Sequence, residues 1–165
     1  MKKVIAVFLP VFFFTSCTSY IYVERHAEKA VSPPSDPPLT AAGAQRAVAL
    51  ADLLKNKKIA VVYSTNTTRT LKTATPLSDS IKKPITIYAA DTTGLFVNKL
   101  KTLKSNVLVV GHSNTVLELL DSFHLAHDLH NIPDNGFNNL FIIKTRRCLG
   151  TKISLTETTY CAPSQ

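Results

Sequence analysis

The stretch from Tyr20 to Lys29 reads YIYVERHAEK, a short β-prone run that ends in an Arg25-His26 pair. A second stretch, from Val107 to Asn114, reads VLVVGHSN and leads from a fully apolar run to His112. β-Branched and aromatic residues dominate both runs, which is typical of strands. Each histidine therefore follows the carboxyl end of an expected strand. We interpret the two stretches as two halves of one catalytic site.

Strand and helix patterns alternate around these stretches. Strands are expected at 20–23, 59–63, 85–88 and 107–111, and helices at 40–55, 67–81 and 95–103 and from Val116 onward. Thr40 is the expected N-cap of the first helix, Thr67 or Thr68 caps the second, and Pro76 should kink it. This order predicts an α/β fold of three layers, with helices on both faces of a mainly parallel central sheet.

The last part of the chain follows another pattern. Strand-like runs at 139–145 and 152–158 flank Leu149-Gly150, which predicts a C-terminal hairpin or meander. In mainly parallel sheets, ligands bind outside the carboxyl ends of the strands. His26, Ser64 and His112 each stand just past such an end, so the site is expected there.

The first residues are not expected to belong to this fold. Lys2 and Lys3 precede an apolar stretch at 4–14, which is shorter than a membrane span of ~20 residues, and Thr15-Ser16 lead to Cys17. This order predicts a bacterial lipoprotein signal peptide at 1–16, cleaved before Cys17, and a single domain at 17–165. Acylated Cys17 would anchor the protein to a membrane of the cell envelope, on the periplasmic or outer-membrane face. A plain secretory signal or a hydrophobic first strand is the alternative.

Length and composition suit one domain with its own core, because 45% of the 165 residues are hydrophobic. The net charge of +8 falls to +6 once Lys2 and Lys3 are removed. The lysines are scattered without an aromatic platform, so no nucleic acid partner is expected. They are interpreted as a solvated face with a weaker role in attracting anionic phosphate esters. Cys148 and Cys161 remain once Cys17 is acylated, and both a disulfide and two separate thiols stay open.

Four short motifs occur in order between about Tyr20 and Leu120. They are Arg25-His26-Ala27-Glu28; Pro38-Leu39-Thr40 with Gly43 and Gln45; Tyr63-Ser64-Thr65 with Arg69-Thr70, Thr73-Ala74 and Pro76-Leu77; and Val110-Gly111-His112-Ser113. Together they resemble the histidine phosphatases of the phosphoglycerate mutase-like superfamily, in particular small capless members such as the phosphohistidine phosphatases. Ala27 stands where the family has glycine, and alanine is small enough to let the backbone approach a phosphate.

The resemblance implies phosphoryl transfer, a chemistry that these residue types suit. His26 is the expected nucleophile, which forms a phosphohistidine that water then hydrolyses. Arg25 and Arg69 are the expected clamps, because arginine holds phosphate oxygens with paired hydrogen bonds. His112 should donate a further hydrogen bond, and Ser64 is a further substrate-binding candidate. No metal and no other cofactor is expected, and a small phosphorylated substrate is the expected partner.

The acid that protonates the leaving group has no obvious position in these motifs. Asp91 is the only acid between Asp79 and Glu118, and it is our candidate for that catalytic role. Glu28 is the alternative. Its other interpretations are a partner of Arg25 or Lys29 and a surface residue.

A cluster of His124, His127 and Asp128 would share one face of a continuous helix. It lacks a recognised zinc-ligand pattern, so no metal site is assigned to it. Three classes of function compete for the whole chain: an envelope phosphomonoesterase, a binding protein that keeps the phosphate pocket, and a mutase. The mutase fits an exported protein poorly, because it needs a cytosolic substrate pool, and His26 favours the esterase over the binding protein.

Overall fold

The computed structural model describes residues 18–127, 129–148 and 150–161. The expected signal peptide and the acylation site Cys17 lie outside the described residues. Within them, no helix is both long and apolar enough to cross a membrane.

A six-stranded mixed sheet forms the centre of the fold, in the order β3-β2-β4-β1-β5-β6. Four neighbouring strands are parallel, and the two C-terminal strands, which form the expected hairpin, are antiparallel to β1 and to each other. The mainly parallel sheet predicted from the sequence is thus confirmed, with an antiparallel edge. The strands are β1 (Thr18–Arg25), β2 (Ile59–Ser64), β3 (Ile85–Ile87), β4 (Asn106–Gly111), β5 (Asn139–Arg146) and β6 (Lys152–Thr159).

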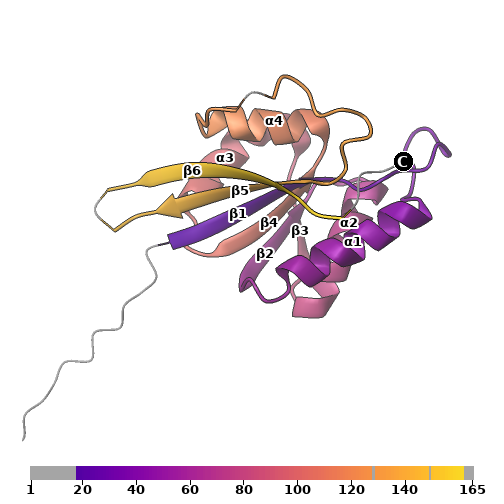
Figure 1. Ribbon diagram of the computed structural model, residues 1–165, viewed down its shortest axis with the longest axis horizontal. Coiled ribbons are helices and arrows are strands. Elements are labelled where there is room, and N and C mark those ends of the chain that lie inside the picture. The colour runs from indigo at the N-terminus through magenta and orange to yellow at the C-terminus, as the bar shows by residue number, and fades with distance from the viewer. Residues whose placement is uncertain (1–17, 128, 149, 162–165) are drawn as a thin grey trace, which may run out of the picture.

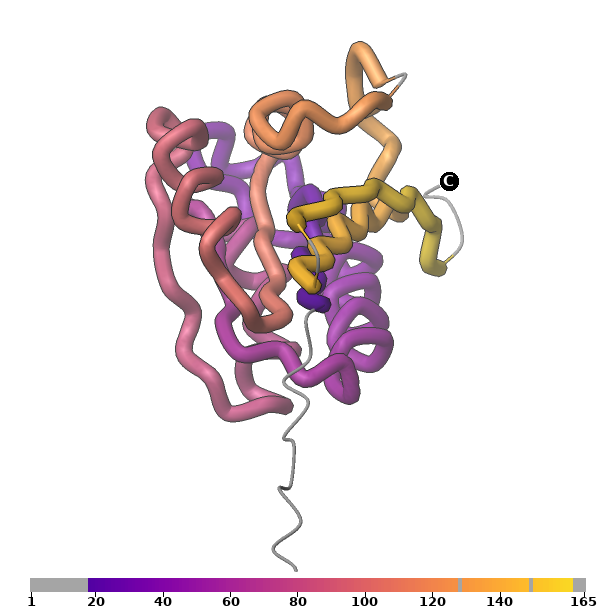
Figure 2. Tube along the Cα trace, turned by 90° about the vertical axis from the view of Figure 1, so that its left-hand side faces the viewer, coloured from indigo at the N-terminus to yellow at the C-terminus, as the bar shows by residue number. Residues whose placement is uncertain are grey.

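Helices cover both faces of the sheet, as expected (Figure 1). On one face, α1 and α2 bury Leu50, Leu54 and Leu77 against the sheet, and on the other, α3 and α4 bury Leu100 and Leu119. Figure 2 shows α1 and α3 on opposite sides of the strands. The helices are α1 (Ala41–Leu54), α2 (Thr68–Ile81), α3 (Thr93–Thr102) and α4 (Ser113–Ser122), with a short 3-10 turn η1 (Ala90–Thr92) before α3.

The predicted N-cap is observed at the start of α1, but the start of α2 is capped by another residue than the sequence predicts. Thr40 caps α1, because its hydroxyl accepts the amide hydrogen of Gly43 at 3.0 Å. Thr67 is the N-cap residue of α2 but its side chain makes no cap hydrogen bond. Asp36, from the loop between β1 and α1, provides the cap instead, because its carboxylate accepts from the Thr68 amide at 2.9 Å. The assigned helix then continues through Pro76.

The continuous helix considered for His124 and His127 is absent from the structure. α4 ends at Ser122, and His124 has a positive φ of 56°, which an α-helix does not allow. His127 instead contacts Asp121 at 3.1 Å, and Asp128 lies outside the described residues. The prediction that these side chains share one face of a continuous helix is therefore wrong. The described residues contain no group of three or more metal-ligating side chains.

Candidate active site

The strand order brings together the side chains that the sequence placed at strand ends. Arg25 is in register with Gly111 across the β1–β4 pair, and the His26 amide donates to the Gly111 carbonyl at 2.9 Å. The ring centroids of His26 and His112 consequently lie 5.5 Å apart. Arg69, in the first turn of α2, reaches the same place, with its Nη2 atom 3.3 Å from Nδ1 of His112. The two clamps and two histidines expected to form the site thus converge.

The ring of His26 is held in one orientation. Its Nδ1 atom lies 2.8 Å from the carbonyl oxygen of Ala27. A carbonyl only accepts, so Nδ1 carries the proton and Nε2 keeps its lone pair. Burial is the main cause that lowers the pKa of His26 to about 4; the nearby Arg25, His112 and Arg69 act in the same direction, and the hydrogen bond to the Ala27 carbonyl opposes them. At neutral pH, Nε2 is therefore a nucleophile without a proton to lose.

His112 has a different hydrogen-bond pattern. Because arginine only donates, the contact with Arg69 makes Nδ1 of His112 an acceptor, and Nε2 then donates to the Thr65 hydroxyl at 3.1 Å. Burial, and with it the charges of Arg69 and Arg25, lowers the pKa of His112 to about 4. His112 is also the N-cap residue of α4, and its amide donates to the Thr115 hydroxyl at 2.8 Å.

Both arginines are fixed by residues that the sequence analysis did not assign to the site. Arg25 donates from Nη1 to the Pro133 carbonyl at 2.7 Å and stacks 4.6 Å above the ring of Phe137. Arg69 lies 3.7 Å from Asp36. In both arginines the Nε–H is buried and has no hydrogen-bond partner among the described residues. Two buried donors without acceptors, beside two neutral imidazoles, make a site that favours an oxyanion.

The loop that carries His26 is held from both neighbouring helices. The buried amide of Ala27 donates to the Thr73 hydroxyl of α2 at 3.0 Å. Glu28 forms a buried ion pair with Arg46 of α1, at 2.6 Å from Nη2. Thr73 belongs to one of the four motifs, but nothing in the sequence showed that its hydroxyl serves the loop after β1. The partners of Arg25 come from 133–137, a segment without periodicity that offered no signal.

The remaining candidates lie less centrally. Ser64 stands at the end of β2, as expected, but its hydroxyl donates to the Thr65 carbonyl at 2.9 Å. Asp91 lies in η1 with an exposed side chain and makes none of the site contacts described above. The carboxylate of Glu28 is buried and held by Arg46, a partner that the sequence analysis did not consider, so Glu28 is not a surface residue. Cys148 and Cys161 are exposed and are not joined by a disulfide.

A family model of the histidine phosphatase superfamily (branch 1) matches residues 21–90, the segment that contains Arg25, His26 and Arg69. No curated protein sequence matches the chain. Among solved structures, a mycobacterial glucosyl-3-phosphoglycerate phosphatase aligns with a TM-score of 0.63 and 11% identity, covering 87% of this chain and 98% of its own.

Two phosphohistidine phosphatases are also similar in structure. SixA in complex with tungstate has a TM-score of 0.64 and 20% identity, and the alignment covers 85% of this chain and 96% of that one. The putative SixA from Nakamurella multipartitia has a TM-score of 0.61 and 18% identity, with 88% and 98% covered. At these identities the likeness concerns the fold. The family match over residues 21–90 and the phosphoglycerate mutase-like fold of the described chain confirm the resemblance to the histidine phosphatase superfamily.

Proposed function

We propose that this chain is an envelope-anchored phosphatase that hydrolyses phosphomonoesters through a phosphohistidine on His26. The observation that carries the proposal is the state of the His26 ring: Nδ1 is bound to the Ala27 carbonyl at 2.8 Å, which leaves Nε2 as the nucleophilic atom. His112 lies beside the His26 ring, and Arg25 and Arg69 are near enough for their charges to lower the pKa of His26. The family match and the phosphatase neighbours support the same reaction class.

In the first step, Nε2 of His26 attacks the phosphorus atom, the N–P bond forms, and the bond from phosphorus to the ester oxygen breaks. The buried Nε–H groups of Arg25 and Arg69 bind the equatorial oxygens, so that the charge of the transition state meets donors already in position. A proton from an acid, for which Asp91 is the candidate, goes to the leaving oxygen.

In the second step, water attacks the phosphohistidine and returns one proton to the acid of the first step, while the N–P bond breaks and inorganic phosphate leaves. Splitting the reaction at a covalent intermediate replaces one difficult displacement by two easier ones. Arginine supplies the positive charge in both steps, so the proposed mechanism uses no metal ion.

A small phosphate ester is the proposed substrate. The neighbours named above act on a phosphorylated sugar acid and on phosphohistidine, which are different leaving groups on the same phosphoryl centre. We infer an open site without a substrate-covering cap, and an open site discriminates leaving groups poorly. The proposed anchor at Cys17 separates the enzyme from cytosolic phosphoproteins, which favours small esters.

A second candidate function is a phosphate-ligand-binding lipoprotein of the same fold. The observation in its favour concerns the two candidate acids: Asp91 is exposed and makes none of the site contacts described above, and Glu28 is paired with Arg46. Binding without turnover would follow from such a site, because general acid assistance is typically worth ~10²–10⁴-fold.

One experiment separates the two. Phosphate release from a panel of phosphomonoesters is measured for wild type and His26→Ala, with and without chelator. We expect turnover in wild type in both conditions, an acid-labile, base-stable phosphoryl label on wild type only, and weak phosphate binding that survives in His26→Ala. Binding without turnover across the panel would establish the binding-protein function, and a label that persists in His26→Ala would exclude His26 as the nucleophile.

The anchor has its own test. Mature protein should partition into detergent and begin at residue 17, and Cys17→Ser should remain unprocessed. Mature protein in the aqueous phase, with a different N-terminus, would contradict the envelope anchor.

A further inference from the structure

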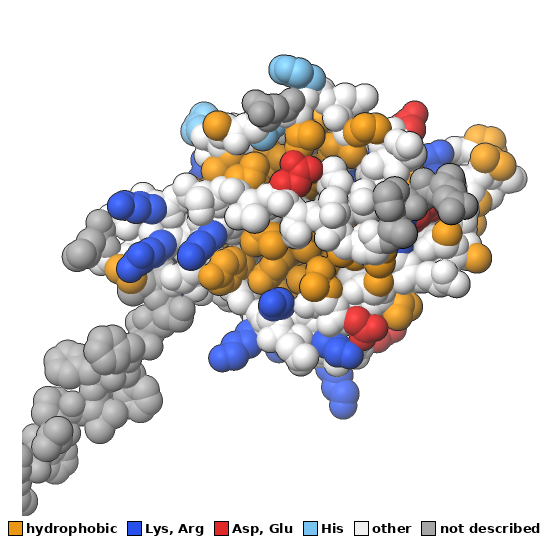
Figure 3. All heavy atoms as spheres, viewed as in Figure 1, with side chains coloured by type: hydrophobic (Ala, Val, Ile, Leu, Met, Phe, Trp, Pro, Cys, Tyr) orange, Lys and Arg blue, Asp and Glu red, His pale blue; other side chains and the backbone are white. Residues whose placement is uncertain are grey.

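Most of the positive charge of the domain collects at one end of the sheet, where the parallel strands begin. Eleven of the 17 Lys and Arg residues that follow Cys17 lie there, in helix ends and turns, against three acids, Asp52, Asp79 and Asp121. Figure 3 shows blue Lys and Arg side chains gathered on the side where the chain enters β1 and below it. The eleven are Lys55, Lys57, Lys58, Lys82, Lys83, Lys99, Lys101, Lys104, Arg146, Arg147 and Lys152. We call this set the basic edge.

The basic edge presents its charges to solvent. Nine of the eleven side chains are exposed, and only Lys101 and Arg147 are half-buried. Among the described residues, Lys55 is the one member with an ion pair, to Asp52 at 2.8 Å. Lysines at the ends of α1, α2 and α3 complement the helix dipoles. That explanation does not extend to Lys57, Lys58 or Lys104, which lie in turns before strands, or to the β5–β6 hairpin.

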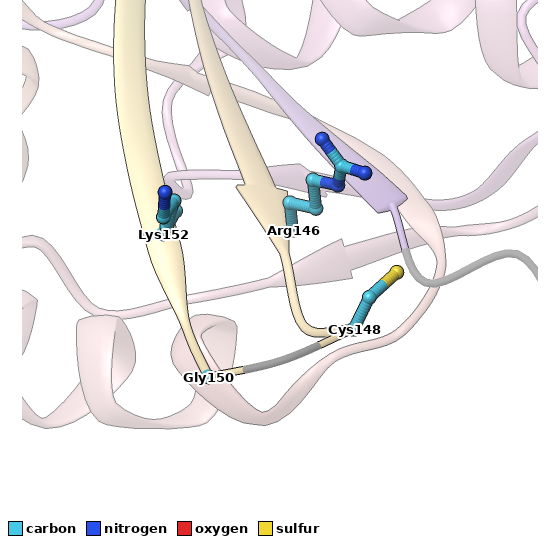
Figure 4. Close-up of a pocket in the computed structure, with 4 residues that line it drawn as sticks. All are labelled: Arg146, Cys148, Gly150 and Lys152. Carbon is cyan, nitrogen blue, oxygen red and sulfur yellow. The ribbon is translucent and has the colours of Figure 1, made fainter.

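The β5–β6 hairpin adds a small hollow to the basic edge. A hollow of about 200 Å³ lies at the β5–β6 turn, lined by Arg146, Cys148, Gly150 and Lys152 (Figure 4). Arg146 ends β5 and Lys152 begins β6, so the two cations approach the hollow from neighbouring strands. A phosphate-sized anion fits a hollow of this size and charge.

The basic edge and the candidate active site lie at opposite ends of the strands. β1 has eight residues, and Arg25 ends it. Eight residues of strand span about 25 Å, roughly three Debye lengths at physiological salt. Charges at that distance are screened, so the basic edge contributes little to attracting an anionic ester to His26. The role in substrate attraction expected for the scattered lysines is therefore not the best account of them.

We propose that the basic edge binds the anionic headgroup surface of a phospholipid bilayer, with the candidate active site facing away from it. A lipid surface matches the observations better than a compact ligand does, because the charges spread over several turns at one end of the molecule. β1 begins at Thr18, directly after Cys17, on this same edge. An acylated Cys17 would hold the basic edge against the bilayer. The proposed binding does not require acylation, because it depends on the charge of the folded domain.

A chain that begins at Thr18 tests the proposal, because both hydrophobic cores and all six strands lie after that residue. Its binding is measured by co-sedimentation with phosphatidylcholine vesicles and with the same vesicles containing phosphatidylglycerol. We expect binding to the anionic vesicles only, weakened by added salt. Each lysine near an anionic surface contributes about fivefold to partitioning, so Lys57→Gln/Lys58→Gln should weaken binding about thirtyfold.

A matched variant removes the same charge elsewhere. Lys29 and Lys72 are exposed lysines near the site end of the strands, and Lys29→Gln/Lys72→Gln should bind anionic vesicles nearly as well as wild type. Lys82→Gln/Lys83→Gln, in the turn before the neighbouring strand β3, should repeat the loss. Equal weakening by the matched variant, or tighter binding to a DNA duplex than to anionic vesicles at equal phosphate concentration, would overturn the proposal. The readout is binding alone, so it stands apart from the proposed catalysis.

Discussion

Gly43 of α1 lies directly against the backbone of Glu28, two residues after His26: a Cβ at position 43 would overlap the Glu28 carbonyl oxygen. That same oxygen accepts the amide hydrogen of Thr40 at 2.9 Å. Arg46, one turn further along α1, binds the Glu28 carboxylate at 2.6 Å. The first turns of α1 therefore hold the loop that carries the proposed nucleophile.

Gly43→Ala should damage this contact. The added methyl group meets backbone atoms, which cannot rotate away, so we expect the free energy of unfolding to fall by about 1–3 kcal/mol and phosphatase activity to fall with it. Urea unfolding and phosphate release measure the two effects.

Gly94→Ala is the matched control, because Gly94 also lies in a helix and a Cβ there meets nothing within 4 Å. Replacing a helical glycine by alanine gains about 0.5–1 kcal/mol in helix stability, so Gly94→Ala should stabilise the protein and keep its activity. Equal behaviour of the two variants would show that the contact between α1 and Glu28 has no role.

The hydroxyl of Thr73 supports the loop from the other helix, and Thr73→Val tests its importance. Valine keeps the shape but leaves the buried amide of Ala27 without its acceptor, which costs about 1–3 kcal/mol. The carbonyl of Ala27 orients the His26 ring, so kcat should fall more than KM rises. Steady-state kinetics on one phosphomonoester separate the two constants.

Thr75→Val provides the comparison. The hydroxyls of Thr73 and Thr75 both donate to the carbonyl four residues earlier, at 2.8 Å, and only Thr73 also accepts from the loop. Thr75→Val should therefore leave kcat unchanged. A similar loss of kcat in both variants would trace the effect to the helix and not to the loop.

Sequence patterns predicted most of the fold because its signals are local. Apolar runs and caps placed all six strands and four helices close to their observed bounds. Strand ends predicted that Arg25, His26 and His112 meet, whereas Arg69, on a helix, was assigned to the site by the family resemblance. The extension of β1 back to Thr18 was not predicted, because Thr18 and Ser19 are polar. Ser19 is buried through a partner distant in sequence, Arg147, which donates to its hydroxyl at 2.9 Å.

The residues that hold the site in place could not be predicted either, because their partners are also distant in the sequence. Asp36 caps α2 from 32 residues away, and Phe137 stacks on an arginine more than 100 residues before it. Such contacts depend on how loops fold over the sheet, and no periodicity encodes them. The distribution of lysines was also invisible in the linear sequence: residues that look scattered along the chain share one edge once the parallel strands align.

Stability should depend on pH through the two buried histidines. The pKa of His26 is lowered to about 4 from its model-peptide value of 6.5, so between these pH values the unfolded chain binds the proton that the folded protein excludes. The free energy of unfolding should therefore fall as pH drops from 6.5 to 4. For His26 alone the loss between pH 7 and 4.5 is about 2–3 kcal/mol. Urea unfolding at the two pH values measures it.

His26→Gln isolates this contribution from that of other titrating groups. The variant lacks the proton-binding ring, so its loss of stability between pH 7 and 4.5 should be smaller than that of wild type. His112→Gln should act in the same direction, because burial lowers the pKa of His112 to about 4 as well. Identical pH dependence in wild type and His26→Gln would mean that His26 titrates normally in the folded protein.

The proposed acid is the assignment that kinetics must decide. β3 ends at Ile87, in register with Ser64 at the end of β2, and Asp91 follows four residues later, so Asp91 belongs to the same edge as the site. An alkyl phosphate needs a proton on its leaving oxygen, whereas nitrophenyl phosphate loses its leaving group readily as an anion. Asp91→Asn should therefore slow the alkyl ester by ~10²–10⁴-fold and the nitrophenyl ester far less.

Asp36→Asn and Asp134→Asn are the controls for Asp91→Asn. Each of these exposed carboxylates lies beside one of the proposed clamp arginines, Asp36 at 3.7 Å from Arg69 and Asp134 at 3.8 Å from Arg25. Their loss should affect both esters alike. Should Glu28→Gln alone show the selective loss, Glu28 would be the acid despite its pairing with Arg46, and Asp91 would be an ordinary turn residue.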